Sequence, residues 1–431
     1  MISPDQLLAT IDRVDRQMMA LIDDLNDEQL AVPFERGINP PIWEMGHSAF
    51  FYEFFLLRSL YGTEPIMPGH DDMWDSFVIP HRERWTPGTV PDKAETLHYY
   101  RRVLDETRDH LTSGSSLSDE ALYLGQYVVA HQCMHLESLV WCRQTLGFHP
   151  PSHLGAEAPG ATPQLGAMGD AEIPGQRYRI GVPVQQEGQK ADNFSFDNER
   201  PGFEMDIASF RISRTLVSLG DFLAFVESGG YEDTRHWSFG GQYWLRQNQL
   251  SAPSYWEKKD GEWMIRRFDS LHPLDPALPL LHVNFWEAEA YCHWAKRRLP
   301  TEFEWEAAAR GPHAHKFPWG TDNALDAPCD LGCRSVGTAP VTAFPESASP
   351  FGCLQMIGTA WEWTSSQYLP YDGFSVDMYP YMSTLQFGDH KTCRGGSGAT
   401  SASLIRSSYR QAFHPDRFDV FTGFRTCALE D

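Results

Sequence analysis

Hydrophobic residues in the first 150 positions recur with the period of an α-helix. The first such stripe runs from Leu7 to Leu25 and follows Ser3, a typical N-cap, with Gln6 placed to complete a capping box. Three further amphipathic stretches follow, at about 41–57, 91–111 and 118–146. Four long amphipathic segments without a strand pattern predict a four-helix bundle over residues 1–150.

Beyond residue 150 the helical period is lost. Residues 151–190 are rich in Pro, Gly, Ala and Gln, and we interpret them as a linker. From 191 to 431 the chain has short β-like pieces and many Trp and Gly residues. Helical spacing returns only near 218–228, 285–297 and 302–310. The pattern therefore predicts a second, irregular α+β domain, and with it a multidomain protein of classes α and α+β.

Composition narrows the class of protein. A chain of 431 residues suggests two to four domains at about 100–200 residues each. The 58 acidic residues exceed the 35 basic ones, which argues against nucleic acid or an anionic membrane as a partner. No apolar run is long enough to span a bilayer, and the first residues do not resemble a secretory signal. Eight cysteines without a CxxC pair favour a reducing compartment, so we expect a cytoplasmic protein.

Two histidines of the last bundle segment share one helical face. His131 and His135 are four residues apart, the spacing at which one helix offers two imidazoles to one metal ion. His47, on an apolar face of the second segment, is a candidate third ligand. Imidazole suits Zn, Fe, Cu or Ni, and three neutral ligands leave open coordination positions, which favours a catalytic site.

Spacing alone leaves other interpretations open. A histidine on an apolar face is commonly a hydrogen-bonded core residue, and a pair four apart arises by chance among 17 histidines. Glu44 or Glu137 is an alternative carboxylate ligand. Glu137 follows His135 by two residues and therefore points about 200° round the helix. We expect Glu137 to be exposed or to support a ligand.

Several segments of the second half share the motifs of a known fold. They include HVNFWEAEAYCHWAKRRLPTEFEWEAAARG (282–311), IGTAWEWTSSQYLPYDGF (357–374) and CRGGSGATSASLIRSSYR (393–410). These segments resemble the formylglycine-generating-enzyme-like fold, a variant of the C-type lectin fold. In the first half, a GHxxxFYE segment and an HxxxH helix resemble a DinB-like bundle. In this order, the two halves resemble the ergothioneine-pathway sulfoxide synthases (EgtB) over nearly the whole chain.

The resemblance implies a chemistry. Members of that family hold a mononuclear non-haem iron on three histidines. They join hercynine, the trimethylated betaine of histidine, to a sulfur donor with O₂. Carried over by motif, the Fe(II) ligands are His47, His131 and His135. The implied partners are hercynine, O₂ and a thiol donor, with no nucleic acid and no membrane, and we expect the active site where the two domains meet.

Residues 409–426 resemble the family segment that contributes to the hercynine pocket. The resemblance implies substrate contacts from Gln411 and Phe413. Gln411 suits the hercynine carboxylate, whereas the alternative is an amide that ties down its own loop. Aromatic faces suit the trimethylammonium group, but we expect Trp361 and Trp363 to be core residues of the lectin-like fold.

Departures from the family pattern cluster on the donor side. Where the donor is γ-glutamylcysteine, arginines after the second helix bind its carboxylates, which implies Arg82 and Arg84 here. The alternative is two solvated loop arginines. Residues 76–78 read Ser-Phe-Val where some members have a Tyr pair, and Met134 stands where Gln is usual. These differences keep the related selenoneine synthases, which couple hercynine to a selenosugar, as an alternative.

A tyrosine is the implied catalytic acid. Oxidative coupling needs a proton or a hydrogen atom at a defined moment, and a phenol supplies either. In the family members that use γ-glutamylcysteine, a Tyr shortly after the YxGF-type segment has this role. The resemblance therefore implies Tyr379, with Tyr381 close behind. The alternative is that both are packing aromatics.

Three rival functions make different demands. A formylglycine-generating enzyme needs paired cysteines after the RGGS motif, and residues 398–410 contain none. A lectin-like binding module predicts no tightly bound metal. A DinB-type zinc thiol-transferase shares the three histidines but does not need O₂. We expect a hercynine oxygenase, with ergothioneine or selenoneine biosynthesis as its setting.

Overall fold

A computed structural model describes residues 2–112, 117–152, 154, 168–184, 194–320 and 328–429. The chain divides into two compact units, the first consisting mainly of Met1–Leu146 and the second mainly of Ser195–Asp431. In the described part of the chain, no helix combines the length and apolar character that crossing a membrane requires.

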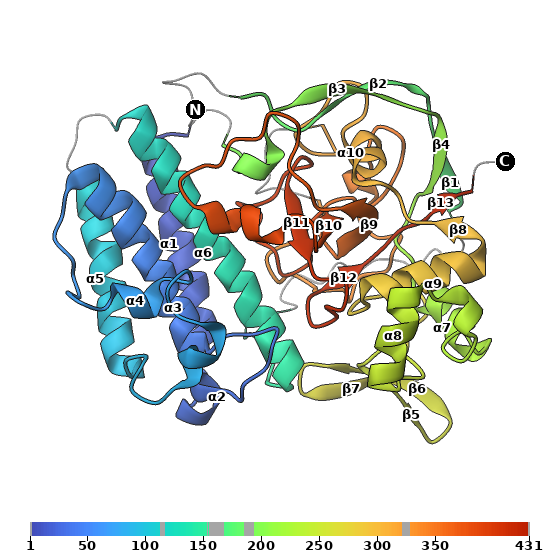
Figure 1. The fold of residues 1–431 in the computed structure, drawn as a ribbon, viewed down its shortest axis with the longest axis horizontal. Helices are drawn as coiled ribbons and strands as arrows, with labels where there is room; N and C mark the ends of the chain where they lie inside the picture. The colour runs from blue at the N-terminus through green and yellow to red at the C-terminus, as the bar shows by residue number, and fades with distance from the viewer. Residues whose placement is uncertain are drawn as a thin grey trace. The chain divides into compact units, whose positions relative to one another are not determined.

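The first unit is a helical bundle, coloured blue to teal in Figure 1. Its long helices are α1 (Pro4–Ile22), α3 (Pro41–Phe51), α5 (Lys93–Thr112) and α6 (Asp119–Leu146). Its shorter helices are α2 (Asp27–Ala31), η1 (Tyr52–Tyr61), α4 (Asp71–Trp74) and η2 (His81–Trp85). Helix α6 packs against α1 and α3, and α3 packs against α5. The predicted four-helix bundle is therefore confirmed.

Capping residues set where the bundle helices begin. Ser3 Oγ accepts a hydrogen bond from the Gln6 backbone N–H at 3.1 Å, and Gln6 Oε1 accepts one from the Ser3 N–H at 2.9 Å. This is the capping box that the sequence predicts. At the start of α6, Ser118 Oγ accepts from the Ala121 N–H at 3.1 Å. Both caps satisfy donors that have no partner within the first turn of a helix.

Helix α3 continues directly into η1, which has π-helical turns. Such turns often occur near functional sites. The segment places Glu53 inside the bundle, where it accepts hydrogen bonds from Arg58 Nη2 and from the Ile66 backbone N–H, both at 2.7 Å. Arg58 also donates to Asp71 at 2.7 Å. These bonds fix the chain that leads from η1 into α4.

In the residues that the structure describes, the second unit has four small sheets and four α-helices. The helices are α7 (Leu219–Glu227), α8 (Phe239–Asn248), α9 (Phe285–Ala295) and α10 (Glu302–Arg310). One sheet has the order β1-β4-β13-β8 and a second has the order β11-β10-β9-β12, with β2-β3 and β5-β6-β7 as the others. The strands are β1 (Asp170–Ile173), β2 (Gln176–Ile180), β3 (Phe203–Ile207), β4 (Phe210–Ser213), β5 (Trp256–Lys259), β6 (Glu262–Arg267), β7 (Ser270–Pro273), β8 (Arg297–Arg298), β9 (Trp361–Gln367), β10 (Lys391–Arg394), β11 (Arg410–Phe413), β12 (Thr422–Gly423) and β13 (Cys427–Ala428).

The prediction of a linker at 151–190 was wrong for the residues that form β1 and β2, between 170 and 180. Strand β1 pairs with β4 and β2 pairs with β3, so these residues belong to the sheets of the second unit. The two strands have only four and five residues, and Pro174 and Gly175 separate them. Such short runs carry too little alternation to stand out from a loop. Of the expected linker, residues 153, 155–167 and 185–190 lie outside the described residues.

The core of the second unit contains both aromatic side chains and paired charges. Trp361 and Trp363 are 1% and 0% exposed, and Trp363 Nε1 donates to the Val283 carbonyl at 2.8 Å, so both are core residues as expected. Arg425 and Glu362, each with no exposed side-chain surface, form an ion pair at 2.6 Å. Removing one partner of such a pair leaves an uncompensated buried charge. The sheet that carries β9 and β11 is therefore held by directional contacts.

Candidate metal centre

Three imidazoles converge inside the first unit. His47 on α3 and His131 and His135 on α6 each offer one ligand atom, and these atoms lie within 4.8 Å of one another. The Nε2 atoms of His131 and His135 are 3.1 Å apart. Two nitrogens bound at right angles to one metal ion, each about 2.1 Å away, lie about 3.0 Å apart. The structure thus brings together the three histidines that the sequence selected, in a geometry that fits a metal ion.

Hydrogen bonds orient two of these rings. His47 Nδ1 lies 2.5 Å from the Trp74 carbonyl oxygen, and His135 Nδ1 forms a short contact with Glu44 Oε2. An acceptor at Nδ1 keeps the proton there and leaves Nε2 as the metal-binding nitrogen. Nε2 of His47 and Nε2 of His135 are therefore the nitrogens available to a metal ion.

Glu44 is held as a carboxylate that supports a ligand. Its Oε1 accepts hydrogen bonds from Asn39 Nδ2 at 2.8 Å and Ser138 Oγ at 2.7 Å, while Oε2 faces His135. Burial raises the pKa of Glu44, but the His135 imidazole and these hydrogen bonds bring it down to about 2. With its oxygens engaged by three donors, Glu44 supports His135 instead of serving as a third ligand. Glu137 is buried and not exposed.

Burial keeps the imidazoles of His47 and His131 neutral. Burial lowers the pKa of His47 well below its usual value of 6.5, and the nearby His135 adds to this effect. Burial also lowers the pKa of His131 well below 6.5, with His135 and His47 contributing. Metal ligands must be deprotonated, so low pKa values favour binding at neutral pH.

Aromatic rings pack on two of the ligands. Trp43 stacks on His47 with ring centroids 4.5 Å apart and planes 12° apart, and Phe51 stacks on His131 at 3.3 Å and 7°. Gly46 allows Trp74 to approach, because a Cβ atom at Gly46 would lie 2.2 Å from the Trp74 ring. Substitution of Gly46 would therefore displace the residue whose carbonyl orients His47.

The two arginines expected at the donor site lie on η2 but have different surroundings. Arg84 Nη1 donates to Asn39 Oδ1 at 2.6 Å, and its guanidinium carbon lies 3.9 Å from the Trp43 ring centroid. Arg82 is exposed and lies over the Phe34 ring at 4.6 Å. Arg84 thus adjoins the groups that contact the metal ligands, whereas Arg82 packs on a different ring.

Sequence reasoning missed five residues that surround the triad. These are Asn39, Trp43, Trp74, Ser76 and Ser138. Ser76 Oγ lies 3.5 Å from His47 Nε2, beside the cluster. Glu44 precedes His47 by three positions and Ser138 follows His135 by three, so helical spacing alone would have placed both near a ligand. Trp43 precedes His47 by four positions on the same helix and carries the same signal. Asn39, Trp74 and Ser76 lie outside α3 and α6, and no spacing along the chain relates them to the three histidines.

The expected hercynine residues Gln411 and Phe413 lie on β11 in the second unit. Gln411 Oε1 accepts a hydrogen bond from the Ala412 backbone N–H at 3.0 Å, so its carbonyl does tie down its own loop. Phe413 is 6% exposed and meets Trp361 and Trp363 edge to face at 6.3 and 6.4 Å. The strand therefore presents a fixed amide next to a packed ring.

Tyr379 is buried and directly precedes η6 (Pro380–Met382). Its loop is tied down at both ends. The Asp377 backbone N–H donates to Asp197 Oδ2 at 3.1 Å, and Ser383 Oγ forms a short hydrogen bond with Asp197 Oδ1. Asp377 also pairs with Arg200 at 2.7 Å. The side chain of Tyr381 lies outside the described residues.

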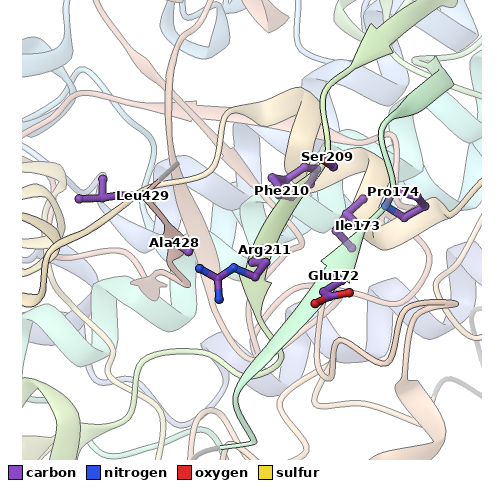
Figure 2. A pocket seen from close by; sticks show the side chains of 8 residues that line it. All are labelled: Glu172, Ile173, Pro174, Ser209, Phe210, Arg211, Ala428 and Leu429. Atoms are coloured by element: carbon purple, nitrogen blue, oxygen red, sulfur yellow. The ribbon is translucent and has the colours of Figure 1, made fainter. Parts of the chain in front are cut away.

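A pocket of about 520 Å³ lies elsewhere in the second unit, at β1, β4 and the end of β13 (Figure 2). Glu172 and Arg211, its charged lining residues, are cross-strand partners. The lining contains neither histidine nor cysteine. It therefore offers no set of metal ligands to compare with the triad.

Comparison with known proteins matches both units. Residues 10–139 match the DinB superfamily, and residues 173–429 match the sulfatase-modifying factor enzyme 1-like domain. The chain is 32% identical to the hercynine oxygenase of Mycobacterium tuberculosis, over 99% of both chains. It is 32% identical to the hercynine oxygenase of Mycolicibacterium smegmatis, over 95% of this chain and 96% of the relative. A formylglycine-generating enzyme of Thermomonospora curvata is 30% identical over 63% of this chain and 97% of its own.

Proposed function

The chain belongs to the hercynine oxygenase family and is an enzyme of the EgtB type, and we propose that it uses non-haem iron and O₂ to form a carbon–sulfur bond on the imidazole of hercynine. The observation that carries the proposal is the convergence of the buried His47 and His131 with the partly exposed His135, whose ligand atoms all lie within 4.8 Å of one another. Three neutral nitrogen ligands leave coordination positions open for substrates. Bound Fe(II) would supply O₂ activation.

The residues of the chain have distinct proposed tasks around that ion. Glu44 and the Trp74 carbonyl hold the His135 and His47 rings in one tautomer, so Nε2 of each is presented without a proton. Burial by Trp43 and Phe51 limits the access of water to the ligands. Neutral ligands also leave the positive charge of the ion uncompensated, which favours anionic co-substrates.

We propose that the second unit binds hercynine and supplies a proton. Gln411 uses its carbonyl oxygen on the Ala412 N–H, so its amide N–H groups are the donors for the hercynine carboxylate. Phe413 supplies an aromatic surface for the trimethylammonium group. The Tyr379 phenol is the proposed proton or hydrogen-atom donor. Arg410 already lies over the rings of Tyr368 and Tyr371, at 4.8 and 4.0 Å, so those faces hold a cation of the protein itself.

The proposed donor is a thiol, with carboxylates bound by Arg82 and Arg84. One observation favours a selenosugar as the alternative donor. Arg84 is already hydrogen-bonded to Asn39 and stacked on Trp43. Arg84 therefore has fewer hydrogen-bond donors left for a donor substrate with two carboxylates than the sequence suggests.

The test is a product assay on anaerobically purified enzyme loaded with Fe(II). Hercynine and O₂ are supplied with γ-glutamylcysteine, cysteine or a selenosugar in parallel. Products are identified by mass spectrometry and O₂ uptake is recorded. We expect hercynine-dependent O₂ uptake and a hercynine–sulfur adduct. Stoichiometric zinc without O₂ uptake would indicate a zinc thiol-transferase instead.

A further inference from the structure

We propose that Arg84 is a positioning residue of the metal centre, which holds two of its three ligands through two separate sets of contacts. The inference rests on the metal site of the proposed function, but not on its substrates. It assigns to Arg84 a task in addition to the proposed contact with a donor carboxylate.

The first set of contacts is a chain of hydrogen bonds. Arg84 Nη1 donates to Asn39 Oδ1 at 2.6 Å, and Asn39 Nδ2 donates to Glu44 Oε1 at 2.8 Å. Glu44 Oε2 accepts from His135 Nδ1. Bonds to charged groups are stronger than bonds between neutral ones, and successive bonds polarise one another. Arg84 thereby fixes the amide that orients the carboxylate on a metal ligand.

The second set of contacts is a stack of rings. The Arg84 guanidinium lies 3.9 Å from the centroid of the Trp43 ring, a distance at which a cation is attracted to an aromatic face. The same indole stacks on the His47 imidazole, with ring centroids 4.5 Å apart and planes 12° apart. Trp43 Nε1 donates to the Met73 carbonyl at 2.8 Å, which fixes the plane of the indole. Arg84 therefore also packs on the indole that stacks on His47.

Arg82 provides a matched comparison within the same turn. Both arginines lie in η2 (His81–Trp85), two positions apart. Arg82 lies over Phe34 at 4.6 Å, whereas Arg84 lies over the ring that stacks on His47. A general effect of positive charge or of packing in η2 applies to both residues. An effect on the metal ligands through Asn39 and Trp43 applies to Arg84.

The experiment measures Co(II) binding by the full-length protein, without any substrate. Co(II) is a suitable probe because its visible absorption reports the geometry of the ligands. Arg84→Met, Arg84→Lys and Asn39→Ala are compared with Arg82→Met, and the melting temperature of each metal-free variant is recorded. We expect Arg84→Met to weaken Co(II) binding by about 10-fold or more, the range found for groups that orient metal ligands. Its absorption spectrum should shift, while Arg82→Met retains the wild-type affinity and spectrum.

The remaining variants separate positioning from folding. Arg84→Lys keeps the charge but lacks the planar fork that stacks and donates at once, so it should restore the affinity only in part. Asn39→Ala should weaken binding in the same direction, and combining it with Arg84→Met should add less than the sum of the two effects. The proposal would be overturned if both Arg84 variants bound Co(II) with an affinity within twofold of that of Arg82→Met and gave the same absorption spectrum. A change confined to the donor KM would do the same. If the wild-type protein binds Co(II) but shows no hercynine-dependent O₂ uptake when it is loaded with Fe(II), the result would instead count against the proposed function.

Discussion

The Glu44 carboxylate contacts Nδ1 of His135, a residue 91 positions further along the chain. The contact joins α3 to α6, the two helices that carry the three converging histidines. Ser138, one turn beyond His135, donates to the same carboxylate at 2.7 Å. Helix α3 thus carries the carboxylate that orients a histidine of α6, and α6 carries the hydroxyl that holds this carboxylate. The contacts that orient the histidine cluster are therefore also contacts that join α3 to α6.

Glu44→Gln should weaken metal binding by about 10- to 100-fold. The amide keeps the size of the side chain but removes the negative charge that holds the His135 Nδ1 proton. Isothermal titration with Co(II) measures the change. Glu120→Gln, on the exposed surface of α6, is the control and should bind like the wild type. Equal affinities for the two variants would show that Glu44 only fills space.

His135→Ala should remove stoichiometric iron while the helical content measured by circular dichroism is retained. The substitution deletes one of the three converging nitrogens and leaves Glu44 with its bonds to Asn39 and Ser138. Iron is quantified by plasma mass spectrometry after anaerobic loading. His149→Ala removes a histidine that is 73% exposed and serves as the control. Unchanged iron in the His135 variant would contradict the ligand assignment.

Acid should destabilise the metal-free bundle from about pH 6.5 downward. Burial lowers the pKa of His47 and of His131 well below 6.5 in the folded state, so below pH 6.5 the unfolded chain binds protons that the folded chain does not. Stability is therefore complete above the unfolded pKa and is lost as pH falls towards the folded values. Each histidine contributes a slope of about 1.4 kcal/mol per pH unit in that window.

Urea unfolding of the metal-free protein between pH 8 and pH 5 measures this dependence. His131→Leu removes one of the two groups and should make the slope smaller. Iron loading should decline over the same window, since protons and metal compete for the same nitrogens. A free energy of unfolding that does not change between pH 6.5 and pH 5 would contradict the neutral, buried state of these rings.

Local sequence signals predict the bundle well. The Ser3–Gln6 capping box forms as expected, and both this box and the Ser118 cap join residues three positions apart. The spacing of His131 and His135 depends only on the helical period. By contrast, the bonds from Asn39 and Arg84 to the site join residues whose proximity depends on how α3 and η2 pack. No pattern along the chain encodes that packing.

The second domain was less predictable for a physical reason. Its strands have two to seven residues, and strands of this length carry weak alternation. The hairpins β5–β7 and helix α8 were therefore not predicted, and β1 and β2 were assigned to a linker. Helices α7, α9 and α10 were predicted from their helical spacing, and the structure adds that each begins at a side-chain cap, at Ser218, Asn284 and Thr301.

The last prediction concerns Tyr379. The residue is buried and its loop is fixed by Asp197, which accepts hydrogen bonds from the Asp377 N–H and from Ser383 Oγ. A fixed loop is what a phenol needs if it is to deliver a proton or hydrogen atom at one position, and such a positioned acid contributes about 10²–10⁴-fold to a rate. Tyr379→Phe keeps the ring and removes only the hydroxyl. We expect iron and hercynine binding to persist while the carbon–sulfur coupling rate falls by about 10²-fold or more. O₂ uptake should then be diverted to oxidation of the donor.

Rapid-mix product analysis and O₂ uptake measure both effects in the same sample. Tyr243→Phe, which removes the hydroxyl of a tyrosine that is 60% exposed on α8, is the control. Asp197→Asn tests the positioning separately, because it weakens the acceptor that holds the loop while leaving the phenol in place. It should lower the coupling rate by less than Tyr379→Phe does and leave hercynine binding unchanged. Coupling at the wild-type rate in Tyr379→Phe would show that this side chain contributes packing and no proton.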